Sequence, residues 1–388
     1  MVGYGFMGAA HSHAWRTAHR FFDLPLTPVL HSIAGRTDSS VRAAAERYGF
    51  ASATTRWQDL VEDPQIDLID ICTPGDTHLE IATAALAAGK HVLREKPLAN
   101  SVEESEQMAR AAQQSREAGS LTMCGFSYRR TPALAYARRL VADGAVGEIR
   151  QIRANYLQDW LSDADAPMTW RLDKDKAGSG ALGDIGAHVI DLAQWVSGQH
   201  IAEVSGTLET MVPTRPAAGT AEGLGGRGDT SGERQQVTVD DVALFTARFA
   251  SGTLGSFEAT RMAQGRKNAM RLEINGSKGS LSFDFERMNE LQFYDATAPE
   301  GRQGFTRILT TEPEHPYAEA WWPTGHGLGY EHTFTHEIAD LVRAIGEGTE
   351  PSPSFEEALQ VQRVLAAVES SSDHGSSWQR IDTQENTR

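Results

Sequence analysis

The sequence predicts an α/β domain built on a parallel sheet, followed by an α+β domain built on a mostly antiparallel sheet. Its 388 residues are enough for about two domains that each bury a core. Short apolar segments alternate with helix-like segments as far as residue 126, which is typical of βαβ units. From there on the strand-like segments become longer and alternate between apolar and polar residues. We therefore expect domains over residues 1–126 and 127–388.

The composition is that of an acidic globular protein. With 36 basic and 52 acidic residues the net charge is −16, which disfavours non-specific binding to nucleic acid or anionic lipid. The chain shows no run of about 18 apolar residues, and its first residues do not have the charged, apolar and small-residue regions that we expect of a signal peptide. Cys72 and Cys124 each end an apolar run, and we expect them to be reduced core residues. These observations favour a cytoplasmic protein that acts on small molecules.

A glycine-rich turn at the N-terminus predicts a dinucleotide site. Gly3, Gly5 and Gly8 precede a helix-like stretch over residues 9–21, an arrangement that lets the backbone approach a pyrophosphate at a helix N-terminus. The strand before this turn consists only of Met1 and Val2, whereas typical strands have about five or six residues. We therefore expect a truncated first strand, because translation of the natural protein starts upstream or because this chain has lost residues.

The remaining elements of the first domain follow in regular order. Strands are expected at residues 30–34, 66–73, 91–94 and 121–126, and helices at 39–48, 78–88 and 102–118. Thr77 with Glu80 and Ser101 with Glu104 have the spacing of capping boxes at the last two helices. Arg36 and Asp38 follow the second strand, where an arginine meets the phosphate of NADP and a carboxylate binds the ribose of NAD. Both cofactors stay open, and Arg36 can equally be a solvated loop cation.

The second domain shows six longer strands, at residues 148–158, 201–211, 242–249, 253–261, 268–275 and 280–286. Short glycine turns between neighbours predict antiparallel pairing. Residues 215–236 are rich in glycine and poor in apolar residues, so we expect a mobile loop there. Helices are expected over 330–345 and 355–371. His332 and His336 would share a helix face near His326, but a zinc site needs more ligands, and we expect no metal.

Two further motifs follow strands of the first domain, and a third lies in the second domain. They are Ile71-Cys-Thr-Pro-Gly-Asp-Thr-His78, Arg94-Glu-Lys-Pro-Leu98 and the segment from Gly178 to Asp191. Together with the glycine turn they closely resemble the glucose–fructose oxidoreductase, inositol dehydrogenase and rhizopine catabolism (Gfo/Idh/MocA) family. Four motifs in this order, spread over both halves of the chain, are more specific than any one of them.

The resemblance implies a Rossmann domain followed by a domain with a large, open, mostly antiparallel sheet. It implies NAD(P)-dependent oxidation of a secondary hydroxyl of a sugar, inositol-like polyol or anhydrosugar, and a homodimer or homotetramer. Carried over by position, the family's catalytic residues are Lys96, Asp184 and His188. Its cofactor-binding positions are Gly3, Gly5, Phe6, Met7, Gly8, Thr73, Pro74, His78, Glu95 and Lys96, with Arg36 and Asp38 less secure because the family varies there.

The chemistry of these residue types supports the same site. Oxidising an alcohol requires a base for the hydroxyl proton, a hydride acceptor and little competing water. His188 is the natural base near neutral pH, Asp184 lies four residues earlier on the same helix face, and Lys96 can stabilise developing alkoxide. Singly, each residue can equally be a surface cation, a helix cap or a buried histidine.

Two residues of the second domain are expected to contact the substrate. They are Tyr156 and Arg171, which can equally be structural residues. A non-catalytic nucleotide-binding sensor on the same fold is the alternative function, although a sensor does not need the proton-transfer set of Lys96, Asp184 and His188. We also predict a cis or sharply turned Lys96–Pro97 bond, because the loop must turn back immediately after a strand.

Overall fold

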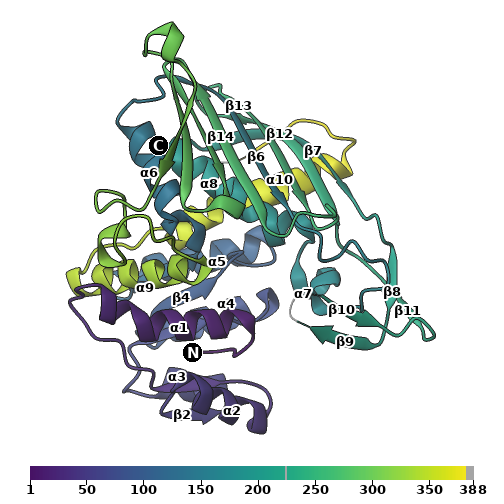
Figure 1. Ribbon diagram of the computed structural model, residues 1–388. Helices are drawn as coiled ribbons and strands as arrows, with labels where there is room; N and C mark the ends of the chain where they lie inside the picture. Colours follow the sequence, from purple (N-terminus) through teal and green to yellow (C-terminus); the bar gives the residue numbers. More distant parts are fainter. Residues whose placement is uncertain (223–224, 382–388) are drawn as a thin grey trace. The chain divides into compact units, whose positions relative to one another are not determined.

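The computed structural model describes residues 1–222 and 225–381 and divides into two compact units. The first unit comprises Met1–Arg130 with Gly329–Gln362, and the second comprises Thr131–Leu328 with Arg363–Arg388. Residues 329–362, which the sequence placed with the second domain, thus belong to the first unit. Helix α9 (Tyr330–Glu347) packs there against α1 (Phe6–Phe21), as Figure 1 shows.

The first unit contains a parallel sheet in two parts. Strands β1 (Ser32–Ala34) and β2 (Ser52–Thr54) form one part, and β3 (Leu68–Ile71), β4 (His91–Glu95) and β5 (Thr122–Gly125) form the other. Val2 connects them through isolated parallel bridges to Ala34 and Ile71. The N-terminal strand is therefore reduced to a single bridging residue, and the parallel arrangement is that of a Rossmann domain.

Helices alternate with these strands. They are α1, α2 (Asp38–Tyr48), α3 (Trp57–Glu62), α4 (His78–Ala87) and α5 (Val102–Arg116). Of the two expected capping boxes, the one at Ser101 is confirmed as an N-cap, because its hydroxyl accepts the Glu104 N–H, while the Glu104 carboxylate accepts the Asn100 N–H. The one at Thr77 is wrong, because that hydroxyl donates to the Pro74 carbonyl instead. The sequence did not predict β2 and α3, which are too short for a clear periodic pattern.

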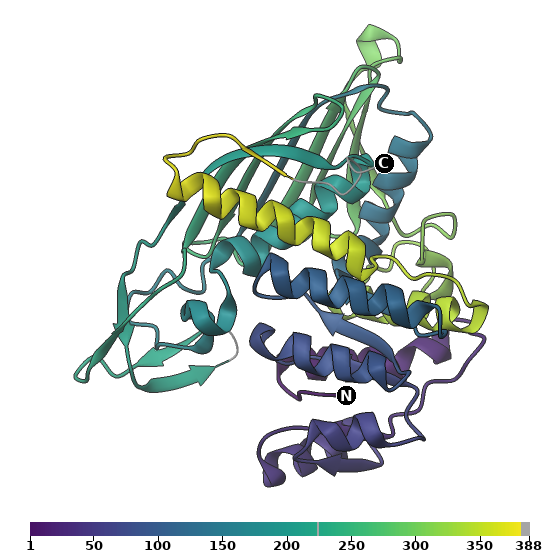
Figure 2. The same ribbon diagram turned by 180° about the vertical axis from the view of Figure 1, so that it is seen from behind.

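The second unit is built on a nine-stranded sheet, seen in Figure 1 and from behind in Figure 2. The strand order is β17-β16-β15-β14-β6-β13-β12-β7-β18, and every neighbouring pair is antiparallel except β6 with β13. The bounds are β6 (Ile149–Leu157), β7 (Ile201–Glu209), β12 (Val242–Phe249), β13 (Leu254–Thr260), β14 (Ala269–Gly276), β15 (Gly279–Asp284), β16 (Glu290–Asp295), β17 (Phe305–Leu309) and β18 (Gln379–Arg380). This confirms the predicted large, mostly antiparallel sheet.

The two faces of this sheet differ in character. Helix α8 (Ala187–Ser197) packs on β6 and β14, and α6 (Pro132–Ala142) packs on β15 and β16. The alternating burial along β12 places Phe245 in the core, where its ring stacks on Phe257. The opposite face carries a polar cluster in which Arg153 binds Glu273 and Asn275. Helices α7 (Lys174–Ala177) and α10 (Phe355–Asp373) complete the α-helices of the described residues.

In its described parts, residues 215–222 and 225–236, the glycine-rich segment is not the loop that the sequence predicted, and residues 223–224 lie outside the described residues. It contains β8 (Thr214–Pro216), β9 (Gly219–Glu222), β10 (Gly225–Gly228) and β11 (Arg234–Gln236), with β8 paired to β11 and β9 to β10. Arg215 is fully buried and donates to the carbonyl oxygens of Asp163 and Leu161 at 2.6 and 2.7 Å. Backbone pairing and one buried cation thus order a segment that lacks an apolar pattern.

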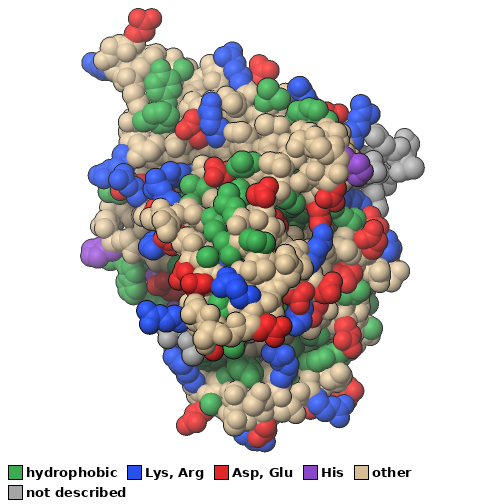
Figure 3. Space-filling view, turned by 90° about the vertical axis from the view of Figure 1, so that its right-hand side faces the viewer, with side chains coloured by type: hydrophobic (Ala, Val, Ile, Leu, Met, Phe, Trp, Pro, Cys, Tyr) green, Lys and Arg blue, Asp and Glu red, His purple; other side chains and the backbone are tan. Residues whose placement is uncertain are grey.

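The surface carries charges of both signs. Figure 3 shows acidic and basic side chains interspersed over the face that it draws. Among the described residues, no helix combines the length and the apolar character that crossing a membrane requires.

Candidate active site

The glycine turn of the first unit has the backbone geometry of a phosphate cradle. Gly3 has φ +101°, and a Cβ at this position would lie 2.9 Å from the Cys72 carbonyl oxygen. A Cβ on Gly8 would lie 2.4 Å from the Gly3 carbonyl oxygen. Helix α1 begins directly after Gly5, which has no side chain to cap the first N–H groups. The turn and the helix N-terminus are therefore open to an anionic ligand such as a pyrophosphate.

The end of β3 is held by buried polar contacts. His78 is buried, its Nε2 donates to the Thr73 carbonyl oxygen at 2.7 Å, and its Nδ1 accepts from the Arg94 guanidinium. Burial, and then the charge of Arg94, hold the pKa of His78 well below its ordinary value, so the ring is neutral. Both ring nitrogens are engaged within the chain. His78 thus supports the Thr73–Pro74 strand end and does not offer a ring nitrogen to a cofactor.

The two residues expected to select the cofactor lie at the surface after β1. Arg36 and Asp38 are both exposed, and Asp38 begins α2. Both carboxylate oxygens of Asp38 lie 3.0 Å from Nε of Arg42. Asp38 is therefore engaged in an exposed i, i+4 ion pair on its own helix, whereas Arg36 lies in the loop before that helix.

The loop after β4 carries Lys96. The Lys96–Pro97 peptide bond is cis, as the sequence predicted, and the Lys96 side chain is partly buried. Glu95 is buried, and its Oε2 accepts the Lys96 backbone N–H at 3.2 Å. Its other oxygen, Oε1, lies 2.8 Å from Nε2 of His11. The Glu95 carboxylate, which the sequence placed at the cofactor, is thus directed into the protein interior.

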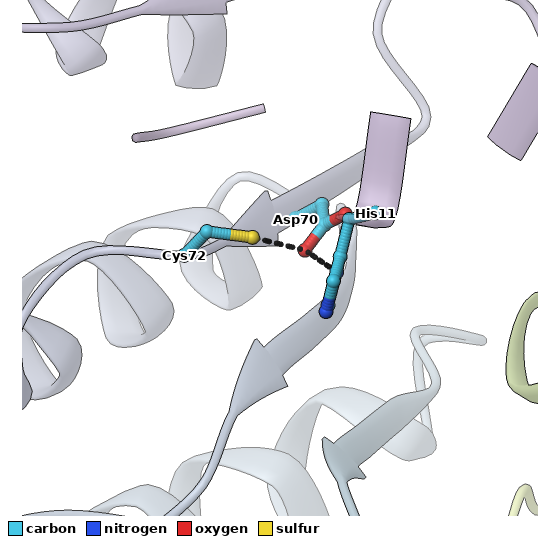
Figure 4. A group of neighbouring side chains, drawn as sticks. All are labelled: His11, Asp70 and Cys72. Atoms are coloured by element: carbon cyan, nitrogen blue, oxygen red, sulfur yellow. Dashed lines mark hydrogen bonds and ion pairs between the residues drawn. The ribbon is translucent and has the colours of Figure 1, made fainter. Parts of the chain in front are cut away.

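A buried ionic cluster lies beneath this loop, and the sequence reasoning missed it. Nδ1 of His11 lies 3.0 Å from both Asp70 oxygens, and the Trp15 indole donates to Asp70 at 2.7 Å, as Figure 4 shows in part. Burial lowers the pKa of His11, but the Asp70 carboxylate more than offsets that effect, so this pKa lies well above its ordinary value. The sequence feature that indicates this cluster is Asp70 itself, since a charged residue inside an apolar strand needs a buried partner.

The same cluster offers three atoms of types that bind metals. Ligand atoms of His11, Asp70 and Cys72 lie within 4.8 Å of one another. The two ring nitrogens of His11 both face carboxylates, so both carry protons and neither has a lone pair for a metal. Burial is the main reason that the pKa of Cys72 rises to about 12, which keeps the thiol protonated. We therefore interpret the cluster as an ion pair.

Two of the histidines considered for a metal have structural partners as well. His332 Nδ1 accepts the Gly329 N–H at 3.0 Å, and His336 Nδ1 lies 2.8 Å from the Arg130 carbonyl oxygen. Burial lowers the pKa of His336 to about 3. His336 is therefore a neutral core residue.

In the second unit, Asp184 and His188 lie on one continuous helical segment. Residues Leu182–Gly186 form a π-helical turn, and α8 follows from Ala187. The Asp184 side chain is 29% exposed, whereas His188 is buried and its ring centroid lies 6.0 Å from that of Tyr156. The sequence predicted a regular helix here, and the wider turn changes the angle between the two side chains. Such turns occur frequently at functional sites.

Asp240 fixes the start of this segment. Its two carboxylate oxygens accept the N–H groups of Gly180 and Leu182 at 2.7 and 2.8 Å, and its carbonyl oxygen accepts the Ala181 N–H at 3.0 Å. A Cβ on Gly180 would lie only 1.8 Å from that carbonyl oxygen, so only glycine fits. Burial raises the pKa of Asp240 above its ordinary value, although Arg261 and the backbone donors oppose this.

A chain of polar side chains continues from Tyr156. The Tyr156 hydroxyl donates to Asn268 Oδ1 at 2.6 Å, Gln158 Nε2 donates to the same oxygen at 2.8 Å, and the Trp160 indole donates to Gln158 at 2.9 Å. These residues provide the aromatic and amide groups that sugar sites commonly use. The guanidinium carbon of Arg171 lies 4.5 Å from the centre of the Trp170 ring.

The predicted residues thus form two groups. The first unit contains the glycine turn, Thr73, Pro74 and Lys96, while the second contains Asp184, His188 and Tyr156. Asp240, Arg261, His11 and Asp70 are the residues that the sequence reasoning did not identify.

Comparison with known proteins identifies relatives of both units. Residues 1–122 match the model of the "Oxidoreductase family, NAD-binding Rossmann fold", and residues 134–282 match that of the "GFO/IDH/MocA C-terminal domain". A levoglucosan dehydrogenase from Pseudarthrobacter phenanthrenivorans is 43% identical over 371 residues, which cover 95% of this chain and 94% of that protein.

Solved structures show the same similarity. An oxidoreductase domain protein from Kribbella flavida superposes with a TM-score of 0.94 at 60% identity and covers 98% of both chains. A levoglucosan dehydrogenase in complex with NADH and levoglucosan has a TM-score of 0.92 at 41% identity, again over 98% of both chains.

Proposed function

The chain belongs to the GFO/IDH/MocA oxidoreductase family, and on that premise we propose that it oxidises a secondary hydroxyl of an anhydrosugar such as levoglucosan, with NAD as the hydride acceptor. Its assignment as a sugar-type NAD-dependent dehydrogenase follows from the family. The anhydrosugar is supported by the levoglucosan dehydrogenases, whose similarity extends over both units and not over the cofactor domain alone.

The residues of the first unit suit a dinucleotide. The pyrophosphate would be held by the turn from Gly3 to Gly8 and by the uncapped N-terminus of α1. At Gly3 and Gly8 a Cβ would lie against backbone atoms. Thr73 and Pro74, at the end of β3, would border the nicotinamide ribose. The cofactor supplies the hydride acceptor when it is bound.

Three side chains would carry the proton chemistry. His188 accepts the proton of the substrate hydroxyl, Asp184 orients the substrate or the imidazole, and Lys96 donates to the oxygen as it becomes an alkoxide. The observation that carries this proposal is the placement of a histidine and a carboxylate, His188 and Asp184, on one segment whose start is clamped by Asp240. A binding protein that performs no chemistry would not need this set.

The test is a turnover assay with purified protein. Levoglucosan, myo-inositol and D-glucose are each combined with NAD⁺ and NADP⁺, and the absorbance of reduced nicotinamide is followed. We expect turnover with levoglucosan and NAD⁺, at a kcat/KM above that of the other sugars. A higher kcat/KM for myo-inositol or glucose would reject the anhydrosugar as the substrate. The assignment as a dehydrogenase would still hold.

A matched pair of variants tests the assignment of the residues. Lys96→Met should abolish turnover, while Lys278→Met, at an exposed lysine in the turn between β14 and β15, should leave it unchanged. Tight NADH binding without turnover on any of the three sugars would favour a non-catalytic role.

A further inference from the structure

A continuous series of contacts joins helix α1 to the backbone of Lys96. His11, on α1, is only 1% exposed, and its Nε2 lies 2.8 Å from Glu95 Oε1. The second oxygen of the same carboxylate accepts the Lys96 N–H at 3.2 Å. On its other side, the His11 ring is held at 3.0 Å by both oxygens of Asp70 on β3. The Lys96 backbone is thus tied to the helix that begins at the glycine turn.

We propose that His11 is a positioning residue for Lys96, which acts by holding the Glu95 carboxylate in the orientation that binds the Lys96 N–H. The inference rests on the proposed catalytic role of Lys96 and deepens it. His11 is almost fully buried, so it would act through Glu95 and not by contact with the substrate. It would link the dinucleotide cradle to Lys96, since α1 starts at the cradle and β4 ends at Glu95, directly before Lys96.

The charges of the cluster explain why a histidine is needed. Asp70 and Glu95 both approach the ring, and their carboxylates would repel each other without a cation between them. Arg94 also acts electrostatically on Glu95. Burial lowers its pKa to about 10, so it remains a cation at pH 7, and its guanidinium binds His78 and the Pro97 carbonyl oxygen. Three other ionisable groups nearby are neutral at pH 7. Burial lowers the pKa of the Met1 amino group to about 6 and raises the pKa of Glu337 to about 8, and Cys72 remains a thiol. The His11 imidazolium is the cation that lies between the two carboxylates, with one ring nitrogen facing each of them.

A small movement of the Lys96 amine would have a large effect on the rate of catalysis. If Glu95 turned away, the Lys96 backbone would lose its partner and the amine could shift by about 1 Å. A displacement of that size at a reacting group can lower the rate by about 100-fold. The effect would fall on kcat, because the pyrophosphate cradle itself would stay intact.

Two amide variants of His11 separate positioning from packing. The amide nitrogen of Gln lies near the place of Nε2 and can still donate to Glu95, whereas that of Asn lies near the place of Nδ1 and reaches only Asp70. We expect His11→Asn to lower kcat by about 10- to 100-fold with the KM for sugar and the Kd for NADH within about 3-fold of wild type. His11→Gln loses the positive charge but keeps the donor to Glu95, so its kcat should lie between that of the wild type and that of His11→Asn. Equal kcat values for the two variants, or a lower value for Gln, would overturn the proposal.

Glu95→Gln tests the same contacts without a change at His11. The amide has a single acceptor oxygen and can bind only one of its two donors, so kcat should fall as in His11→Asn. Adding His11→Asn to Glu95→Gln should lower kcat little further, because both changes break one series of contacts. If the two substitutions lowered kcat by independent factors that multiply, the mechanism would be contradicted. Glu95→Gln by itself still tests the contacts if a His11 variant does not fold.

Two controls complete the experiment. His31→Gln alters a second histidine–carboxylate pair of the first unit, 3.0 Å from Asp63 and partly exposed, and should leave kcat unchanged. Lys96→Met distinguishes a failure of the proposed role of Lys96 from a failure of the proposed role of His11. If that variant keeps full turnover, the proposed role of Lys96 is wrong. If it is inactive while His11→Asn retains wild-type kcat, only the positioning role of His11 is wrong.

Discussion

Nη1 of Arg261 lies 3.7 Å from Oδ2 of Asp184, and the guanidinium that makes this contact is completely buried. Nη2 of the same arginine donates to the Asp240 carbonyl oxygen at 3.0 Å. One buried cation thus adjoins both the candidate catalytic carboxylate and the residue that fixes the start of its helical segment. A charge in such a place is costly to bury unless it is paired, so its loss should affect the site directly.

We predict that Arg261→Met lowers kcat/KM by about 10-fold or more, because Asp184 loses the positive charge beside it. The melting temperature should also fall, because Asp240 loses a buried donor. Steady-state kinetics and thermal unfolding check both effects. Arg271→Met, at a half-exposed pair with Asp284 on β15, is the control and should leave kcat/KM unchanged. Wild-type kcat/KM in the Arg261 variant would contradict a role at Asp184.

His188→Ala should lower turnover by roughly 100- to 10,000-fold, the usual range for the loss of a general base. NADH affinity should change little, because the cofactor cradle is formed by the first unit. The wild-type rate should rise with pH as the base loses its proton, and Asp184→Asn should shift that profile. His200→Ala, at an exposed histidine after α8, serves as the control. Near-wild-type turnover with an unchanged profile would make Lys96 the base.

Arg36→Ala should weaken NADP binding more than NAD binding, because only NADP presents a 2′-phosphate to the strand end where this exposed arginine lies. Dissociation constants for both reduced cofactors, measured by fluorescence, check this. Arg56→Ala removes a comparable exposed arginine near Asp59 and should change neither constant. Equal weakening of both cofactors by Arg36→Ala would remove this residue from cofactor selection.

Glu337→Gln should stabilise the protein more at pH 8 than at pH 4. Glu337 is fully buried on α9, no described residue forms a hydrogen bond to its carboxyl oxygens, and burial raises its pKa from 4.5 to about 8. Between these values the unfolded chain is ionised while the folded protein keeps the proton. The free energy of unfolding of the wild type therefore falls as pH rises through this range. Glutamine at position 337 does not titrate, so the free energy of unfolding of the variant does not fall in this way.

Thermal unfolding at pH 4, 6 and 8 measures this effect. The melting temperature of Glu337→Gln minus that of the wild type should grow by at least about 3 °C from pH 4 to pH 8. Glu331→Gln, at an exposed glutamate in the first turn of the same helix, should show no such trend. A difference independent of pH would show that Glu337 is ionised in the folded protein.

We expect the open face of the nine-stranded sheet to mediate a homodimer or homotetramer. Leu244 and Leu254 are exposed on neighbouring strands of this face, beside the polar cluster around Arg153. Analytical ultracentrifugation at micromolar concentration should detect the oligomer, and Leu244→Lys with Leu254→Lys should dissociate it. Leu26→Lys, at an exposed leucine of the first unit, should not. A monomeric wild type would reject the prediction.

The sequence predicts what local patterns determine. Alternating apolar segments identified the parallel and antiparallel sheets, and the turn at Lys96–Pro97 followed from a proline directly after a strand. Contacts between distant positions left no local pattern. His11 and Asp70 are 59 residues apart, and Asp240 meets Gly180 across 60 residues. The strands β8–β11 were missed for a different reason, because backbone pairing and the buried Arg215 hold them without an apolar pattern.

The clamp formed by Asp240 also bears on the order in which the protein folds. Its bonds to Gly180 and Leu182 close loops of about 60 residues, and a closure of that length follows the formation of the local turns and hairpins around it. The helical segment with Asp184 and His188 should therefore become ordered late, after β12 and β13 have paired. A refolding chain should regain its sheet, measured by far-ultraviolet circular dichroism, before it regains turnover. Asp240→Asn should lengthen the time between these two recoveries.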